Sequence, residues 1–161
     1  MRHWVFAYGS NMDLKDLERW CRERERPLGH VDHAEAAVLP NHALVWDYYS
    51  DARKGGAANV EQRAGAELWG LALLVCPTAL RVIDDKEGHP RRYRRGPRPV
   101  PARLRSGGEV AAWVYVVREE FRRQEQVPPT RHYRDIMLRA ARAHGFPEHY
   151  LRELERLPTR D

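Results

Sequence analysis

Two short stretches of the chain carry residue types that could bind and convert a small polar substrate. The first, Tyr8-Gly9-Ser10-Asn11, lies between an apolar run and a pattern typical of a helix. A loop that enters a helix presents consecutive backbone N–H groups at the positive end of the helix dipole, and this arrangement binds carboxylates, phosphates or oxyanions. An ordinary turn, in which Asn11 or Asp13 caps the helix, explains the same residues. The nucleotide-binding patterns GxGxxG and GxxxxGKS/T are absent.

The second stretch runs from Asp84 to Glu87 and holds three acidic residues in four positions. Glu87 falls in the last turn of a predicted helix, where the negative end of the helix dipole and the neighbouring aspartates disfavour its ionised form. We therefore expect the pKa of Glu87 to lie above its usual value, as a general base that acts near neutral pH requires. A solvated helix end explains the same charges, and the arginines that follow can offset the shift.

Arginines surround one tyrosine between Arg91 and Arg98, in the order RRYRRGPR. Cations interleaved with an aromatic ring could contact RNA, and this run is the best argument for a non-catalytic binding module. No RNP, KH or helix-turn-helix pattern accompanies it, and the net charge of the chain is a modest +5. Pairing of these arginines with a substrate carboxylate, or with Asp84 and Asp85, explains them equally well.

Signatures of metal and covalent catalysis are weak. His30 and His33 have an HxxH spacing, but no second pair of ligands stands at the distance of a metal site. Ser10 is not part of a GxSxG elbow, and Cys76 closes an apolar run, where a buried thiol is the usual explanation. We expect no metal and no other cofactor.

The elements that must position these residues follow from hydrophobic periodicity. A strand from His3 to Tyr8 leads through the Gly-Ser-Asn turn into a helix with apolar residues three positions apart. Residues 34–39 and 42–49 look like two strands joined by a turn at Pro40-Asn41, and a polar, flexible segment follows at 50–56. Residues 67–76 and 109–117 carry apolar residues on both faces of a strand. This pattern predicts strands that are covered on both sides, in a barrel or in a sheet wrapped by helices.

Three helices are predicted in the rest of the chain. The first has Thr78 as its N-cap and ends at Gly88. The second begins near Thr130 and stops at Gly145, and the last covers residues 148–157. The buried face of the second helix should consist of Tyr133, Ile136, Met137, Ala140 and Ala141.

The bulk composition is that of a globular protein. The chain has 161 residues, 42% of them hydrophobic and 32% charged, and we expect one domain over residues 1–161. Two cysteines in dissimilar contexts do not form a disulfide framework and suit a reducing compartment. The longest apolar stretch, 68–76, is far shorter than the roughly 18 residues that cross a bilayer, and no signal peptide is apparent. We expect a cytoplasmic location.

Five motifs together resemble the γ-glutamylcyclotransferase family, which includes AIG2-like members. They have the family's order and approximate spacing, and the resemblance extends from about residue 5 to residue 157. The motifs are FAYGSNM (6–12), GGAANV (55–60), ELWGLAL (67–73), IDDKEG (83–88) with Tyr93 beyond it, and PPTRHY (128–133), which opens a helix ending in HGFP (144–147).

The resemblance implies an α+β fold, a small mixed β-barrel or highly bent sheet flanked by helices. It implies conversion of a γ-glutamyl-amino acid or γ-glutamyl amide into 5-oxoproline and a free amine, with Glu87 as general acid/base. It also implies a small-molecule γ-glutamyl substrate, a homodimer, and no nucleic-acid or membrane partner. The substrate-binding residues that it implies, largely through main-chain groups, are Phe6, Ala7, Tyr8, Gly9, Ser10, Asn11, Tyr93 and Tyr133.

The identity of the leaving amine is open at this point. The family also includes enzymes that act on γ-glutamylamine isopeptides or on biosynthetic intermediates, and members without known activity. The glutathione-specific relatives usually differ around their glycine-rich loop and fit less well. Two segments depart from the family's pattern, the long charged loop 22–33 and the basic GHPRR sequence at 88–92, and both could line the leaving-group side.

Overall fold

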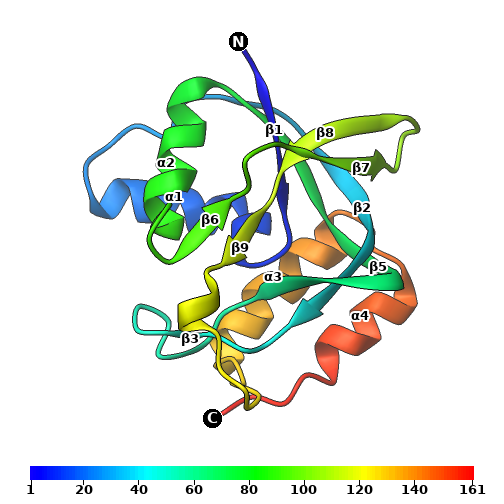
Figure 1. Ribbon diagram of the computed structural model, residues 1–161. Helices are drawn as coiled ribbons and strands as arrows, with labels where there is room; N and C mark the ends of the chain where they lie inside the picture. The colour runs from blue at the N-terminus through cyan, green and yellow to red at the C-terminus, as the bar shows by residue number, and fades with distance from the viewer.

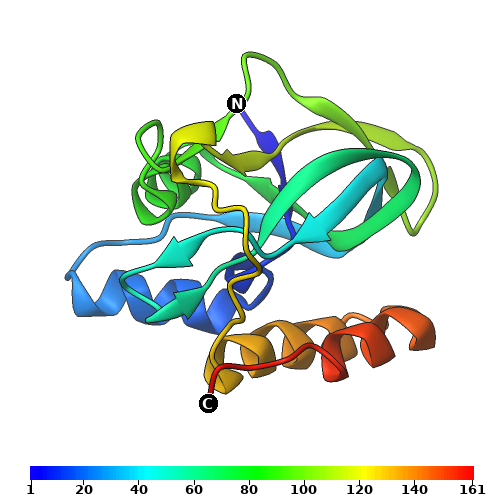
Figure 2. The same ribbon diagram turned by 60° about the horizontal axis from the view of Figure 1, so that its bottom comes forward.

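Five strands close into a barrel in the computed structural model, which describes residues 1–161 (Figure 1). The barrel order is β1-β5-β2-β7-β8; β8 pairs with β1 in parallel, and all other pairs are antiparallel. The two longest strands, β2 and β5, bend strongly and make most of the wall (Figure 2). The barrel strands are β1 (His3–Ala7), β2 (Val31–Val45), β5 (Asn59–Val75), β7 (Val100–Leu104) and β8 (Glu109–Trp113).

Two small antiparallel pairs lie outside the barrel. β3 (Tyr49–Ser50) pairs with β4 (Gly55–Gly56), and β6 (Tyr93–Arg95) pairs with β9 (Tyr115–Val117).

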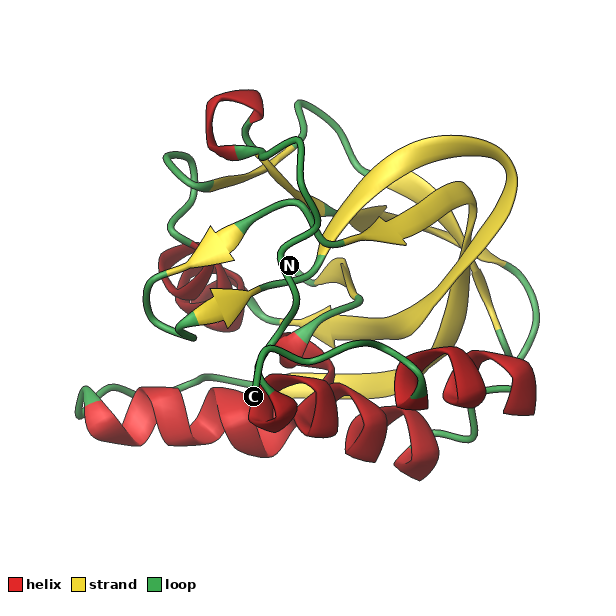
Figure 3. Cartoon of the chain, turned by 90° about the horizontal axis from the view of Figure 1, so that it is seen from below, coloured by secondary structure: helices red, strands yellow, loops and turns green.

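The helices pack around the outside of the strands (Figure 3). α3 and α4 lie side by side, and α1 and α2 flank the other end of the barrel (Figures 1 and 2). No helix is both long and apolar enough to cross a membrane. The helices are α1 (Leu14–Glu23), α2 (Pro77–Glu87), α3 (Arg131–Ala143) and α4 (Glu148–Glu155), with two 3-10 turns, η1 (Ser10–Met12) and η2 (Glu119–Phe121).

The core confirms that β5 is covered on both sides, whereas the same prediction for residues 109–117 is wrong, because Glu109, Ala111 and Val116 are exposed. In β5, the consecutive residues Leu71, Ala72 and Leu73 are all fully buried. Because successive side chains of a strand point to opposite faces, one face packs inside the barrel and the other lies under helices or neighbouring segments. The predicted buried face of α3 is confirmed as well, since its five residues from Tyr133 to Ala141 all lie in the core. The fold is therefore the α+β mixed barrel flanked by helices that the sequence predicts.

The predicted turn at Pro40-Asn41 is wrong, because β2 runs through it as one strand. Its pairing with β5 shifts register at this point, because Pro40 pairs with Glu67 whereas His42 pairs with Gln62. The single residue Asn41 of β2 therefore lies opposite residues 63–66 of β5, which bulge out of the ladder. Asn41 absorbs the irregularity with a positive φ of 60°, a conformation that asparagine tolerates better than most residues. Its side chain accepts a hydrogen bond from the Gly65 N–H at 3.0 Å, which holds the bulge of β5 against β2.

Other boundaries differ from the sequence-based expectation as well. The strand expected over 42–49 ends at Val45, and the strand expected over 67–76 begins at Asn59. The N-cap of α2 is Cys76, whose sulfur accepts from the Ala79 N–H, and Thr78 lies inside the helix. Residues 109–117 form two strands, because β8 pairs within the barrel while β9 leaves it to pair with β6. The polar segment 50–56 is not a free loop, because it contains β4, which pairs with β3. Both glycines of β4 are buried.

Candidate active site

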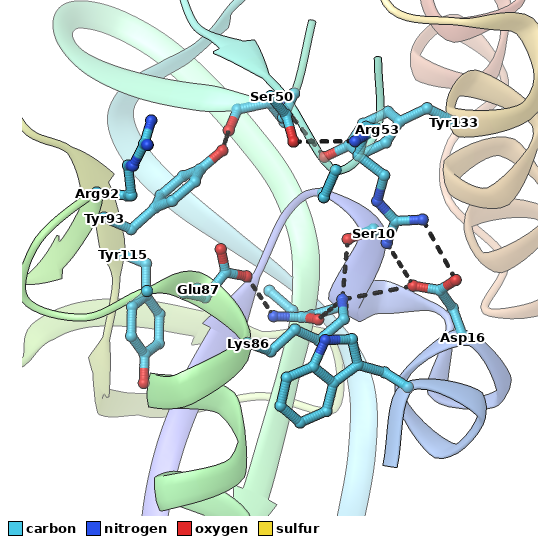
Figure 4. Close-up of a pocket in the computed structure, with 18 of the residues that line it drawn as sticks. Ser10, Asp16, Ser50, Arg53, Lys86, Glu87, Arg92, Tyr93, Tyr115 and Tyr133 are labelled. Atoms are coloured by element: carbon cyan, nitrogen blue, oxygen red, sulfur yellow. Dashed lines mark hydrogen bonds and ion pairs between the residues drawn. The ribbon is translucent and has the colours of Figure 1, made fainter. Parts of the chain in front are cut away.

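A cavity of about 480 Å³ opens between the end of β1, the end of α2 and the turn that joins β3 to β4. Every residue that the sequence nominates for catalysis or substrate binding lies on its wall, although these residues come from segments far apart in the chain. Figure 4 shows four of them: Ser10, Glu87, Tyr93 and Tyr133. The nominated residues on the wall are Phe6, Ala7, Tyr8, Gly9, Ser10, Asn11, Glu87, Tyr93 and Tyr133.

The loop after β1 is shaped to aim Asn11 at the cavity. The chain leaves the barrel at Tyr8 and makes the 3-10 turn η1 before α1 begins. Asp13 caps α1 by accepting from the Lys15 N–H at 3.0 Å, so the capping function falls to Asp13 and not to Asn11. The Asn11 side chain is thereby free to reach Glu87, and its amide nitrogen lies 2.5 Å from the Glu87 Oε1 oxygen.

Glu87 is the last residue of α2, and Gly88 ends the helix in the left-handed conformation. Burial of the carboxyl raises the pKa of Glu87, while the charges of Lys86 and Arg53 and the hydrogen bond from Asn11 oppose this shift without cancelling it. The expected direction is confirmed, but its main cause is burial and not the neighbouring aspartates. Asp84 and Asp85 are occupied elsewhere, since each pairs with an arginine at 2.8 Å, Arg95 and Arg26 respectively.

Two buried tyrosines, Tyr93 and Tyr133, are held by Ala58, the residue that precedes β5. Tyr93 donates its hydroxyl proton to the Ala58 carbonyl at 2.6 Å, and Tyr133 accepts from the Ala58 N–H at 3.1 Å. Burial raises the pKa of both hydroxyls, so they stay protonated at neutral pH. Because Tyr133 uses its oxygen as an acceptor, its own proton can be donated to a ligand in the cavity. A side chain at Gly9 would lie 2.8 Å from the Tyr133 hydroxyl, so this contact requires a glycine.

A cluster of charged side chains behind Asn11 was not predicted from the sequence. Lys86 donates to the Asn11 carboxamide oxygen at 2.6 Å and lies 3.4 Å from Asp16, and Arg53 donates to Asp16 at 2.7 Å (Figure 4). One signal was available, because Asp16 falls on the apolar face of α1 beside Leu17, where a carboxylate needs a partner. Nothing in the local sequence indicates that Arg53, in a polar turn, is that partner.

The arginines between Arg91 and Arg98 do not all have the same role: one pairs with a protein carboxylate, and another lines the cavity. Arg95 pairs with Asp84, and its guanidinium also lies over the Trp113 ring at 4.6 Å. Arg92 stacks on the Phe121 ring at 4.7 Å and lines the cavity. Arg24, at the start of the charged loop 22–33, lines the cavity as well, so both irregular segments place an arginine on its wall.

The residues present do not form a metal site. No group of three or more histidine, cysteine, aspartate or glutamate side chains is close enough to hold a metal ion. Both cysteines are free and buried. What the cavity offers is a carboxylate with a raised pKa, tyrosine hydroxyls, an amide and arginines. Such a set can bind a charged, amide-containing substrate and move protons on it.

Comparisons with known proteins show which family the chain belongs to. The family described as "Gamma-glutamyl cyclotransferase, AIG2-like" matches residues 5–135. Gamma-glutamylcyclotransferase of Bos taurus is 25% identical over 169 residues, which cover 97% of this chain and 79% of that protein.

Solved structures share the fold. A gamma-glutamyl cyclotransferase superposes with a TM-score of 0.80 at 22% identity, covering 100% of this chain and 90% of that chain. A crystal structure of an uncharacterized protein from Homo sapiens gives a TM-score of 0.78 at 24% identity, covering 99% of this chain and 90% of that chain. Because the family match extends over most of the sequence, the chain belongs to the AIG2-like gamma-glutamyl cyclotransferase family.

Proposed function

We propose that the protein converts a γ-glutamyl-amino acid or γ-glutamyl amide into 5-oxoproline and the free amine, with Glu87 as the general acid/base. The observation that carries the proposal is the contact between two distant motifs. The Asn11 amide of the YGSN loop holds the Glu87 carboxyl at 2.5 Å on the wall of one cavity. Family membership supports the reaction class.

The substrate carries its own nucleophile, so the site need only fold it and move protons. The α-amine attacks the γ-carbonyl carbon, a five-membered ring closes, and the bond from that carbon to the leaving nitrogen breaks. No water or other co-reactant is consumed. Holding the two reacting groups together can supply about 7–11 kcal/mol of the barrier, which leaves proton transfer as the remaining chemical task.

Glu87 is suited to that task by its raised pKa. In the proposed mechanism its carboxylate takes a proton from the α-ammonium group, which makes the nitrogen nucleophilic. The same carboxyl then returns a proton to the leaving nitrogen as the tetrahedral intermediate collapses. A general acid/base with a pKa moved toward neutrality performs both steps more efficiently than an ordinary glutamate.

The loop and Tyr133 complete the binding of the γ-glutamyl group. The first N–H groups of a helical turn have no partner within it, so those at the start of η1 can hold the α-carboxylate or the developing oxyanion. The Tyr133 hydroxyl oxygen lies against Gly9, so its proton can be donated to a ligand in the same region. Arg24 and Arg92 on the cavity wall favour a leaving group that carries a carboxylate, which an amino acid does and a simple amine does not.

A substrate panel tests the proposal. The purified protein is incubated with γ-glutamyl-amino acids and with γ-glutamylamines, and release of 5-oxoproline is measured. We expect turnover of the γ-glutamyl-amino acids, and loss of 10²- to 10⁴-fold in kcat on Glu87→Gln, roughly the contribution of a general acid/base.

Asp85→Asn is the matched control, because Asp85 lies on the same helix and lines the same cavity, but its carboxylate pairs with Arg26 at 2.8 Å whereas that of Glu87 is held by Asn11. Turnover of the panel by Glu87→Gln at the wild-type rate contradicts the assignment of Glu87. Turnover of γ-glutamylamines, without turnover of γ-glutamyl-amino acids, would show that the protein is a γ-glutamylamine cyclotransferase instead.

A further inference from the structure

Lys86 precedes the proposed catalytic glutamate and has an unusual environment for a lysine. Its side chain is only 7% exposed, although a lysine is rarely buried without a charged partner. The partner is Asp16, 3.4 Å away, whose side chain is 3% exposed. Besides this ion pair, the ammonium group donates to the Asn11 carboxamide oxygen at 2.6 Å and to the Ser10 hydroxyl at 3.2 Å.

These contacts determine which way the Asn11 amide faces. An ammonium group has three donors and no acceptor, so the Asn11 atom that faces Lys86 must be the oxygen. The NH₂ group then faces Glu87 and donates to Oε1 at 2.5 Å. If the amide were reversed, its oxygen would oppose the carboxylate and its NH₂ group would oppose the ammonium. Lys86 therefore imposes the one orientation in which Asn11 can hold an ionised Glu87.

The hydrogen bond from Asn11 occupies one oxygen of Glu87 and leaves the other available. No protein group donates to Oε2, and this atom is not among the buried polar atoms that lack a partner. Oε2 is therefore accessible from the cavity, where a substrate can reach it. Asn11 thus holds Oε1 of Glu87 and leaves Oε2 free to exchange protons with a substrate.

We propose that Lys86 is a positioning residue, which fixes the Asn11 carboxamide so that Asn11 holds Glu87 with Oε2 facing the substrate. The inference rests on the proposed role of Glu87 in proton transfer. The Lys86 ammonium group is engaged by Asn11, Ser10 and Asp16, and in this proposal it acts through Asn11. Asp16, which Arg53 and Arg19 hold in turn, keeps Lys86 in place.

The counter-ion is ionised over the working range. Burial alone would raise the pKa of Asp16, but hydrogen bonds from Arg53 and Arg19 and the charge of Lys86 hold that pKa well below its usual range. Removing the Lys86 charge leaves Asp16 with two arginine partners. A neutral side chain at position 86 therefore does not strand a buried carboxylate, which makes the substitution tolerable for folding.

The other groups that face Glu87 predict the electrostatic effect of that substitution. The cations around it are Lys86 from α2 and Arg53 from the turn between β3 and β4. The remaining titratable groups that sense its charge are tyrosines whose pKa values burial raises, so they are neutral near pH 7: Tyr8, Tyr48, Tyr93, Tyr115 and Tyr133. Loss of Lys86 thus removes one of two positive charges near the carboxylate and raises the pKa of Glu87 further.

The experiment compares Lys86→Met, Lys86→Gln and, as a matched control, Lys15→Met at an exposed position of α1. Methionine removes the charge and the donor, whereas glutamine removes the charge and keeps an NH₂ donor for the Asn11 oxygen. Two quantities are measured: the pKa of Glu87 by carbon-detected NMR in the free protein, and kcat against pH for γ-glutamyl-alanine.

For Lys86→Met we expect a higher pKa of Glu87, an acid limb of the kcat profile moved to higher pH, and a plateau kcat lower by roughly 10- to 100-fold, the range of a hydrogen bond to a charged group. Lys86→Gln should show the same rise in pKa but regain most of the plateau kcat. Lys15→Met should match the wild type in both. If Lys86→Met does not fold, Lys86→Gln carries the test with the same two expectations.

An unchanged pKa and kcat in the Lys86 variants overturns the proposal. Equal losses of plateau kcat in the methionine and glutamine variants also overturn it, because Lys86 would then act by charge alone and not by orienting Asn11. Failure of the proposed function looks different. In that case the wild type releases no 5-oxoproline, while the NMR titration still reports whether Lys86 controls the pKa of Glu87.

Discussion

Replacement of Gly56 by alanine should damage both stability and the site. A Cβ atom at this position would lie 1.8 Å from the Val127 carbonyl oxygen, whereas real Cβ contacts stay beyond about 3.0 Å. The obstacle is backbone, which cannot rotate away, so β4 and the 127–128 segment must separate by about 1.2 Å. The Gly56 N–H donates to the Pro128 carbonyl at 2.9 Å, and this hydrogen bond is lost as they part. Overpacking and the lost hydrogen bond together predict about 2–4 kcal/mol of destabilisation.

The damage should reach the chemistry, because β4 leads directly into Ala58. The Ala58 peptide groups hold Tyr93 and Tyr133, so a shift of this segment moves both hydroxyls. A misplacement of about 1 Å can cost roughly 10²-fold in rate, and we expect a loss of kcat of that order.

Urea unfolding followed by the fluorescence of the five tryptophans measures the change in stability. Gly96→Ala is the control, because the nearest atom to its added methyl group is 3.7 Å away and we expect a change within about 0.5 kcal/mol. Equal stability of Gly56→Ala and Gly96→Ala would refute the argument from close approach.

Two further predictions follow from burial in the cavity. Glu87→Gln should stabilise the protein at pH 7. The pKa of Glu87 is raised in the folded state, so the stability of the wild type falls as the pH rises above the unfolded-state pKa of about 4.5. The gain in stability should vanish below about pH 4, where the carboxyl is protonated in both states. Chemical unfolding at pH 4 and pH 7 checks this, with the exposed Glu125→Gln as control, and a gain independent of pH would contradict it. Tyr133→Phe should cost about 1–3 kcal/mol, since the Ala58 N–H loses its acceptor. Protection of that amide in hydrogen exchange should fall as well, and unchanged protection would show that another acceptor serves it.

Much of the fold could be predicted because its elements carry local signals. The buried face of α3 repeats every three or four residues, and the doubly apolar run in β5 indicates a strand covered on both sides. Errors arose where a tertiary contact overrides a local preference. Pro40-Asn41 is a turn signal in isolation, yet β5 pairs with β2 on both sides of it, and β5 accommodates the irregularity with a bulge opposite Asn41.

The candidate site shows the same division. The YGSN loop and Glu87 could be chosen from motif and residue type, and even the direction of the Glu87 pKa shift could be argued from the helix end. The cause of that pKa shift could not be predicted. The neighbouring aspartates pair with Arg95 and Arg26, and burial of the Glu87 carboxyl raises its pKa. Arg53 and Asp16 were missed as partners because 37 positions separate them and neither has a motif.

The sequence by itself determined the inventory of the site and the scaffold that carries it: a strand, a glycine-containing loop and a helix end with a carboxylate. Periodicity and capping are properties of neighbours along the chain, so these features are readable without a structure. Only the tertiary structure decided how the parts meet. Closure of the barrel brings Asn11 to Glu87 across 76 positions and places Lys86 behind the amide. The desolvation and hydrogen bonds that tune the carboxylate depend on that closeness in space, which no spacing in the sequence encodes.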